Sequence, residues 1–191
     1  MKRVMGLDAS STTIGLCLLR YDDTKIELEH VEFYKPPKKG NVFERLQSVR
    51  QYIFDMTSAL KPDVVALEEI LLWMGGGKKC PVCKQKMGRQ STAKTITTLT
   101  ALNRTVGLAV LDKTGNSPFL YNVMSIRHKI KEGKKIPKKE DVPERVAKIL
   151  DIEFPYRLNK LKKIAKENED MADAIAVALC HIFVERQNEQ G

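Results

Sequence analysis

Four acidic residues, spread over almost the whole chain, stand where carboxylates can do chemistry. Asp8 ends an apolar segment and is followed by the small and hydroxyl residues ASSTT. Glu68 closes the apolar stretch VVALE, and Asp170 and Asp173 are three residues apart in EDMADAIAVAL. Residues at this spacing share one face of a helix. Each acid alone also has an ordinary structural explanation, such as a strand end turned to solvent or a favourable charge at a helix N-terminus.

Taken together, the four acidic residues predict a shared site that none of them would predict alone. If the strands ending in Asp8 and Glu68 are neighbours, and the alanine-rich helix packs closely on them, four carboxylates meet at one sheet edge. Carboxylates held this close repel one another unless cations lie between them. An oxygen-only ligand set suits Mg²⁺ or Mn²⁺. Two such ions activate a water and stabilise the leaving oxygen in phosphodiester hydrolysis, so the pattern predicts a two-metal nuclease site.

The elements that must position these acids follow from the hydrophobic periodicity. We expect a single α/β domain over residues 1–191, with a mixed sheet flanked by helices. The expected strands are 4–8, 13–20 and 26–34 in an antiparallel meander, then 64–72, parallel to the first, and 119–124. The expected helices are 43–60, 92–111 capped by Ser91 or Thr92, 142–150 and 169–186. A loop rich in Gly, Lys and Cys, about 74–91, reads as an insertion, and 129–139 reads as a basic loop.

The charge balance favours a polyanionic partner. Lys and Arg number 33 against 24 Asp and Glu, a net charge of +9. A merely soluble basic protein would show this too, but here the cations cluster in 78–94 and 127–139, as phosphate binding requires. The residues expected to bind DNA are Lys78, Lys79, Lys84, Lys86, Arg89, Arg127, Lys129, Lys131, Lys134, Lys135 and Lys138.

The cysteines offer half of a zinc site. Cys80 and Cys83 form CPVC, whereas Cys17 and Cys180 lie in apolar runs and read as core residues. No second CxxC follows, so a complete zinc site within one chain is disfavoured, and an alternative is a four-thiolate site shared by two copies of the loop across a dimer. The chain has neither an apolar run of about 18 residues nor a secretory signal. We therefore expect a cytoplasmic protein, in its own cell or in an infected host, and disfavour a disulfide.

The segments GLDASSTTIGLCLL, ALEEI and EDMADAIAVALCH resemble, in order and spacing, the acidic motifs of the RuvC-type Holliday junction resolvases of the RNase H-like superfamily. The resemblance implies that Asp8, Glu68, Asp170 and Asp173 bind metal, that the chain dimerises through helix 92–111, and that branched DNA is the substrate. It also implies basic residues near Arg127 or Lys129 and near Lys138. His181 matches a family histidine, for which a buried role is the simpler expectation.

The chain also departs from the family pattern. Ala9-Ser10 replace a proline and a glycine, and Leu71 stands where an aromatic residue is expected, although Trp73 could stack on the junction. With the CPVC loop, these departures suggest a divergent member from a phage or mobile element.

Three other functions remain open. GLDASST also resembles the phosphate-binding turn of actin-like and sugar-kinase ATPases, which need roughly twice this length. The second alternative is a DNA-binding protein that has lost cleavage. The presence of all four mutually repelling acidic residues argues against it, because loss of metal ligands would relieve the repulsion. A related nuclease could act on flaps, forks or RNA. The sequence leaves open the cleavage specificity and the preference among these substrates.

Overall fold

A mixed five-stranded sheet forms the centre of the protein, as the sequence predicted. The computed structural model describes residues 1–10, 12–70, 93–159 and 161–189. The strand order is β3-β2-β1-β4-β5. β1 (Lys2–Ala9), β2 (Ile14–Tyr21) and β3 (Ile26–Tyr34) form an antiparallel meander, and β4 (Val64–Glu69) and β5 (Phe119–Asn122) continue the sheet in parallel.

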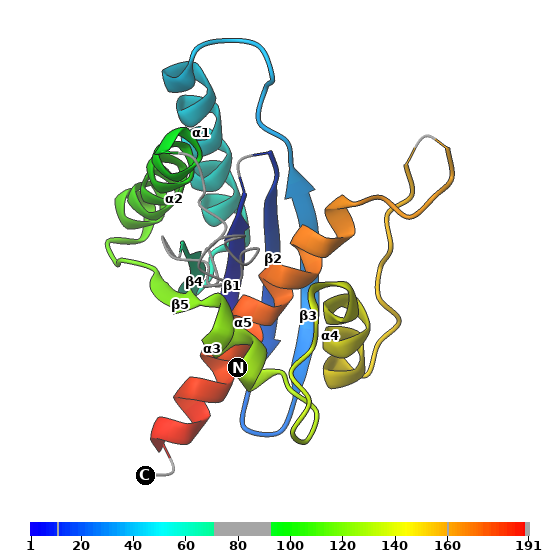
Figure 1. The fold of residues 1–191 in the computed structure, drawn as a ribbon. Helices are drawn as coiled ribbons and strands as arrows, with labels where there is room; N and C mark the ends of the chain where they lie inside the picture. The colour runs from blue at the N-terminus through cyan, green and yellow to red at the C-terminus, as the bar shows by residue number, and fades with distance from the viewer. Residues whose placement is uncertain (11, 71–92, 160, 190–191) are drawn as a thin grey trace, which may run out of the picture.

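Helices cover both faces of this sheet (Figure 1). α1 (Val42–Leu60) and α2 (Ala93–Thr114) pack together on one face, over a core that includes Met5 and Leu67. α5 (Glu167–Glu189) crosses the other face, with α3 (Val123–Lys129) and α4 (Val142–Leu150) beside it. Val4 and Ala66 belong to the core on this side. Side chains alternate between the faces of a strand, so Asp8 and Glu68 also face α5.

Two glycines let α5 lie directly on the sheet. A Cβ atom at Gly15 would stand 2.0 Å from the backbone oxygen of Asp170, and one at Gly6 would stand 2.2 Å from that of Ala174. The Cys17 thiol, next to Gly6 across the β1–β2 pair, donates a hydrogen bond to the same Ala174 oxygen at 3.3 Å. The start of α5 is therefore fixed over the ends of β1 and β2.

One predicted strand was too long. The strand expected over 119–124 ends at Asn122, where α3 begins, a helix that the sequence analysis did not predict. The Asn122 side chain accepts a hydrogen bond from the Ser125 backbone at 2.9 Å, which caps the new helix. A short 3₁₀ turn, Lys139–Asp141, also interrupts the expected basic loop.

The predicted bounds of β3 and α4 are confirmed, whereas those of several other elements differ from the structure or fall partly outside the described residues. α5 begins at Glu167, so Asp170 lies in its first turn and Asp173 in its second. α2 runs to Thr114, three residues past the predicted end. The strand predicted over 64–72 ends at Glu69, and Ile70 is no longer part of it. Residues 71–72, the expected cap of α2 at Ser91 or Thr92, and the 74–91 insertion lie outside the described residues. In the described part of the chain, no helix is long and apolar enough to cross a membrane.

Candidate active site

The structure brings the four acidic residues together between α5 and the ends of two central strands. β1 and β4 are adjacent and parallel, with Leu7 beside Leu67, so the next residues along, Asp8 and Glu68, end the strands side by side. Gly15 is the partner of Asp8 across the β1–β2 pair and contacts the backbone of Asp170. All four acidic residues are only partly buried, so a substrate can reach them.

The pKa values of all four carboxyl groups are raised, first by burial and then by neighbouring carboxylates. Burial, and then the charges of Glu68, Asp173 and Asp170, raise the pKa of Asp8 well above its usual value. Burial and the charge of Asp173 raise the pKa of Glu68 to about 7. Burial raises the pKa of Asp173 to about 6 and also raises that of Asp170. The protein thus holds four carboxylates that disfavour one another's ionisation.

Two cationic side chains partly offset this repulsion. The Lys139 ammonium lies 3.7 Å from a carboxylate oxygen of Asp173 and 3.6 Å from one of Glu169. Burial lowers the pKa of Lys139, but the surrounding carboxylates outweigh it and the net shift is upward. The charge of Arg127, on α3, lowers the pKa of both Glu68 and Asp173.

Lys139, rather than the predicted Lys138, is the second basic residue at the site. Lys138 is exposed and forms an ion pair with Glu140 at 3.9 Å. The sequence analysis placed Lys139 within a basic stretch but did not select it. The only signal in the sequence was the pair Lys138-Lys139 at the start of the turn. This pair does not indicate which of the two side chains points toward the carboxylates.

Two buried polar residues that the sequence analysis missed support the site. The Asn103 side chain, on α2, donates a hydrogen bond to the backbone oxygen of Glu68 at 2.9 Å, which fixes the end of β4. A hydrogen bond from the Thr13 side chain lowers the pKa of Asp170. The sequence did contain a signal for Asn103. It is a polar residue among the apolar positions of the helix predicted over 92–111, which indicates a buried hydrogen-bonding role.

The donor chemistry of this cluster fits a hard divalent cation. All four groups offer carboxylate oxygens, which suit Mg²⁺ or Mn²⁺. Within the described ranges, however, no three His, Cys, Asp or Glu side chains already stand in the arrangement of a metal site. The candidate zinc ligands Cys80 and Cys83 lie outside the described residues, as do Trp73 and the predicted DNA-binding residues Lys78, Lys79, Lys84, Lys86 and Arg89.

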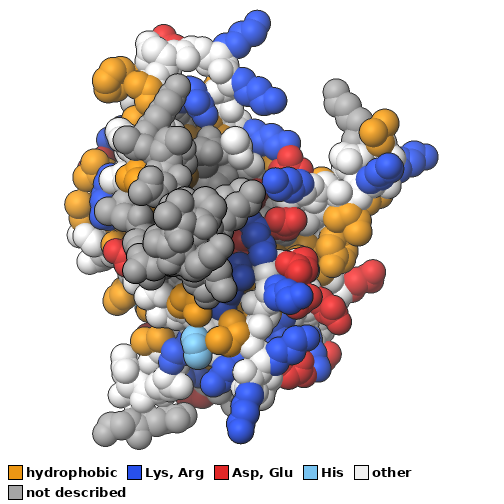
Figure 2. All heavy atoms as spheres, in the orientation of Figure 1, with side chains coloured by type: hydrophobic (Ala, Val, Ile, Leu, Met, Phe, Trp, Pro, Cys, Tyr) orange, Lys and Arg blue, Asp and Glu red, His pale blue; other side chains and the backbone are white. Residues whose placement is uncertain are grey.

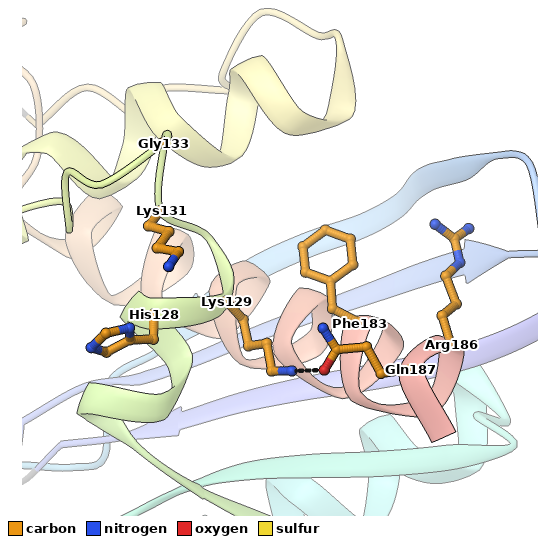
Figure 3. A pocket seen from close by; sticks show the side chains of 7 residues that line it. All are labelled: His128, Lys129, Lys131, Gly133, Phe183, Arg186 and Gln187. Carbon is orange, nitrogen blue, oxygen red and sulfur yellow. Dashed lines mark hydrogen bonds between the residues drawn. The ribbon is translucent and has the colours of Figure 1, made fainter. Parts of the chain in front are cut away.

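Among the residues that the structure describes, the other predicted basic residues do not gather at the carboxylates. Lys129 and Lys131 line a cavity of about 470 Å³ with Phe183 and Arg186, near the opposite end of α5. Figure 3 shows Lys129, the last residue of α3, reaching Gln187 on α5. Lys134 and Lys135 are exposed in the turn that follows. The predicted basic stretch 127–139 is thus distributed along α5 rather than concentrated at one point.

His181 is a packing residue. It is 5% exposed and lies two turns beyond Asp173 on α5. Its Nδ1 is 2.9 Å from the Tyr121 hydroxyl, and burial lowers its pKa. This matches the buried role expected from the sequence.

Comparison with known proteins gives one consistent result. The family model described as crossover junction endodeoxyribonuclease RuvC matches residues 4–181. A protein of that name from Finegoldia magna is 28% identical over 95% of this chain and 93% of its own length. The structure of Thermus thermophilus RuvC in complex with a Holliday junction substrate matches with a TM-score of 0.70 at 22% identity, covering 97% of this chain and 96% of that one. The yeast mitochondrial Holliday junction resolvase Ydc2 matches with a TM-score of 0.68 at 13% identity, covering 99% and 81%.

Proposed function

The chain belongs to the RuvC family of crossover junction endodeoxyribonucleases, and on this premise we propose that it cleaves Holliday junctions by metal-dependent hydrolysis of phosphodiester bonds. The observation that carries the proposal is the meeting of four carboxylates between α5 and the ends of β1 and β4. The proposal is supported by their raised pKa values, which come first from burial and then from the charges of neighbouring carboxylates, and so mark an electrostatic cost of keeping these acids. A fold that served only stability would gain by replacing them with neutral residues.

In this mechanism Asp8, Glu68, Asp170 and Asp173 hold the metal, most simply two Mg²⁺ ions. When bound, such ions activate a water and stabilise the leaving oxygen of the cleaved phosphodiester. The protein contributes the fixed ligand positions, through the contact of α5 with Gly15 and the hydrogen bond from Asn103.

The chain's own cations would assist at the same site. Lys139 and Arg127, at the two ends of the basic stretch 127–139, interact electrostatically with these carboxylates and lower the pKa of Asp173. They can also contact the DNA phosphate as it approaches the ions.

A homodimer would match the symmetry of the substrate. A four-way junction has near two-fold symmetry, so a two-fold dimer can present one site to each of two opposing strands. Exposed apolar side chains on α2 and β5 offer a surface for the second copy, with Leu108 56% and Phe119 53% exposed. We propose that this surface, continuous with the helix predicted to dimerise, forms the interface. Sedimentation of Leu108→Glu should then show a monomer where the unaltered chain is a dimer.

The central test compares three synthetic DNAs: a four-way junction, a fork and a linear duplex, each with Mg²⁺ and with EDTA. We expect paired, symmetric nicks near the crossover of the junction, in Mg²⁺ only. Asp8→Asn should bind the junction and leave it uncut. Equal nicking of all three DNAs would refute junction specificity but not nuclease activity. Unchanged cleavage by Asp8→Asn would refute the assigned site.

A further inference from the structure

The segment between α4 and α5 forms a projecting arm that the chemistry above does not use. We call residues 155–166 the basic arm. Its sequence, PYRLNKLKKIAK, contains five Lys or Arg residues and no Asp or Glu. In Figure 1 this segment, in orange, leaves the start of α5 and extends away from the sheet. In Figure 2 its outer part, at the upper right, carries blue and orange side chains, so it presents cations and apolar groups together.

The base of the basic arm is anchored to the first turn of α5. Asn168 is 2% exposed. Its side-chain nitrogen donates to the backbone oxygens of Arg157 at 2.9 Å and Ala165 at 2.6 Å, and its oxygen accepts from the Arg157 nitrogen at 2.7 Å. The Ala165 nitrogen also donates to the Arg157 oxygen at 2.9 Å. These bonds close the arm as a hairpin at the point where α5 begins.

The outer part of the basic arm is also ordered by hydrogen bonds. Leu158 pairs with Ile164 in an isolated β-bridge. The Asn159 side chain accepts from the backbone nitrogens of Leu161 at 2.8 Å and Lys163 at 3.1 Å. Yet Leu158, Leu161 and Ile164 are 61%, 76% and 63% exposed. Exposed apolar side chains on a pre-organised hairpin indicate a binding surface, because little ordering entropy remains to be lost on binding.

The position of the basic arm places it beside the candidate active site. Asp170 lies three residues after Glu167, the first residue of α5, and is thus one turn from the anchor. Two residues of extended chain, from Arg157 to Asn159, span about 7 Å, and Leu161 lies in the turn that the Lys162 nitrogen closes by donating to the Asn159 oxygen at 2.9 Å. That length corresponds to about two nucleotide steps along one DNA strand, before the side chain at position 161 is added. The tip can therefore reach DNA on either side of a phosphate held at the carboxylates.

We propose that the basic arm binds the junction strand next to the cleaved phosphate, with its lysines on backbone phosphates and Leu161 packed against a base exposed at the crossover. This inference rests on the proposed function. Charge complementarity selects DNA over a protein partner, because five cations without an acid match a phosphate backbone. Apolar side chains that insert between base steps are a recurrent means of holding distorted DNA.

The first test measures DNA binding in an Asp8→Asn background, so that the DNA stays intact. The double variant Lys162→Gln/Lys163→Gln should lower the slope of log affinity against log salt by about 2, since each phosphate contact contributes about 0.9. Leu161→Ser should weaken junction binding about tenfold and leave binding to linear duplex unchanged. Ile152→Ser, another exposed apolar residue between α4 and α5, is the matched control and should bind like the parent. An unchanged slope together with unchanged junction affinity would overturn the inference.

A second test locates the contact directly. Leu161→p-benzoylphenylalanine should photocrosslink to junction DNA within about four nucleotides of the crossover, given the reach of the arm and of the added side chain. Crosslinks only to a second copy of the chain, or none to DNA, would overturn the inference. The two proposals fail separately. A chain that crosslinks here but never cuts a junction supports the arm and refutes the nuclease, whereas cutting without the crosslink does the reverse.

Discussion

Neutralising Glu68 should stabilise the metal-free protein while abolishing cleavage. The pKa of Glu68 rises from 4.5 to about 7 in the folded protein. Because the folded-state pKa is the higher one, stability is fully present below pH 4.5 and is lost as the pH rises through about 7. The difference corresponds to about 3 kcal/mol of unfolding free energy at pH 8. Glu68→Gln keeps the shape of the side chain and removes this loss.

The assay is urea unfolding in EDTA at pH 4 and pH 8. We expect Glu68→Gln and the parent to be about equally stable at pH 4, and the variant to be more stable by about 3 kcal/mol at pH 8. Adding Mg²⁺ should stabilise the parent more than the variant, since ligand binding to the folded state adds to its stability. Glu69→Gln, one position along β4 and on the other face of the sheet, should change stability by less than about 0.5 kcal/mol at either pH.

The result that refutes the reasoning is a pH-independent difference. If Glu68→Gln is no more stable than the parent at pH 8, then neither burial nor the charge of Asp173 disfavours ionised Glu68 in the folded chain. The electrostatic argument for a shared cation site would then fail. Loss of cleavage alone would not rescue it, because a merely structural change could also abolish activity.

Two further predictions test how the site is built. Gly15→Ala should destabilise the protein by about 3 kcal/mol in urea unfolding and reduce junction cleavage, because the new methyl group collides with the α5 backbone 2.0 Å away. Gly107→Ala, where a Cβ meets only a Pro118 side-chain atom at 3.8 Å, should be neutral or slightly stabilising, and equal effects at the two glycines would contradict the close contact. Lys139→Gln should move the acidic limb of the cleavage pH profile upward, because the lysine lowers the pKa of Asp173. Lys138→Gln should leave the profile in place, and a similar shift in both variants would refute the inward position assigned to Lys139.

The sequence predicted the sheet, the strand-end acids and the aspartate pair because each depends on local periodicity. Asp8 and Glu68 close apolar runs, and the parallel arrangement of such strands puts their ends at one edge. The three-residue spacing of Asp170 and Asp173 fixes their common face whatever the exact helix start. The new helix α3 was missed because one capping residue, Asn122, ends the strand inside a continuous apolar pattern.

Contacts between distant segments were beyond sequence reasoning. Gly15 has no local reason to be a glycine, and its role depends on α5 lying against it. Likewise, the choice of Lys139 over Lys138 depends on the turn Lys139–Asp141, whose three residues show no periodicity. The basic arm was overlooked because its mixed apolar and basic residues show no strand periodicity, and its hairpin depends on hydrogen bonds to Asn168 at the start of α5.

The charges of the chain and of the site have opposite signs, and this difference argues for metal dependence. The whole chain carries +9, which attracts DNA. At the site, four carboxylates face two cations, Lys139 and Arg127. A phosphodiester drawn in by the outer field would meet a local excess of negative charge and be repelled at the point of cleavage. Divalent ions held by these carboxylates would remove this conflict by offsetting their negative charge, whereas monovalent salt only screens both attraction and repulsion. High NaCl should therefore fail to replace Mg²⁺ in junction cleavage, and cleavage in NaCl with EDTA would refute this charge argument.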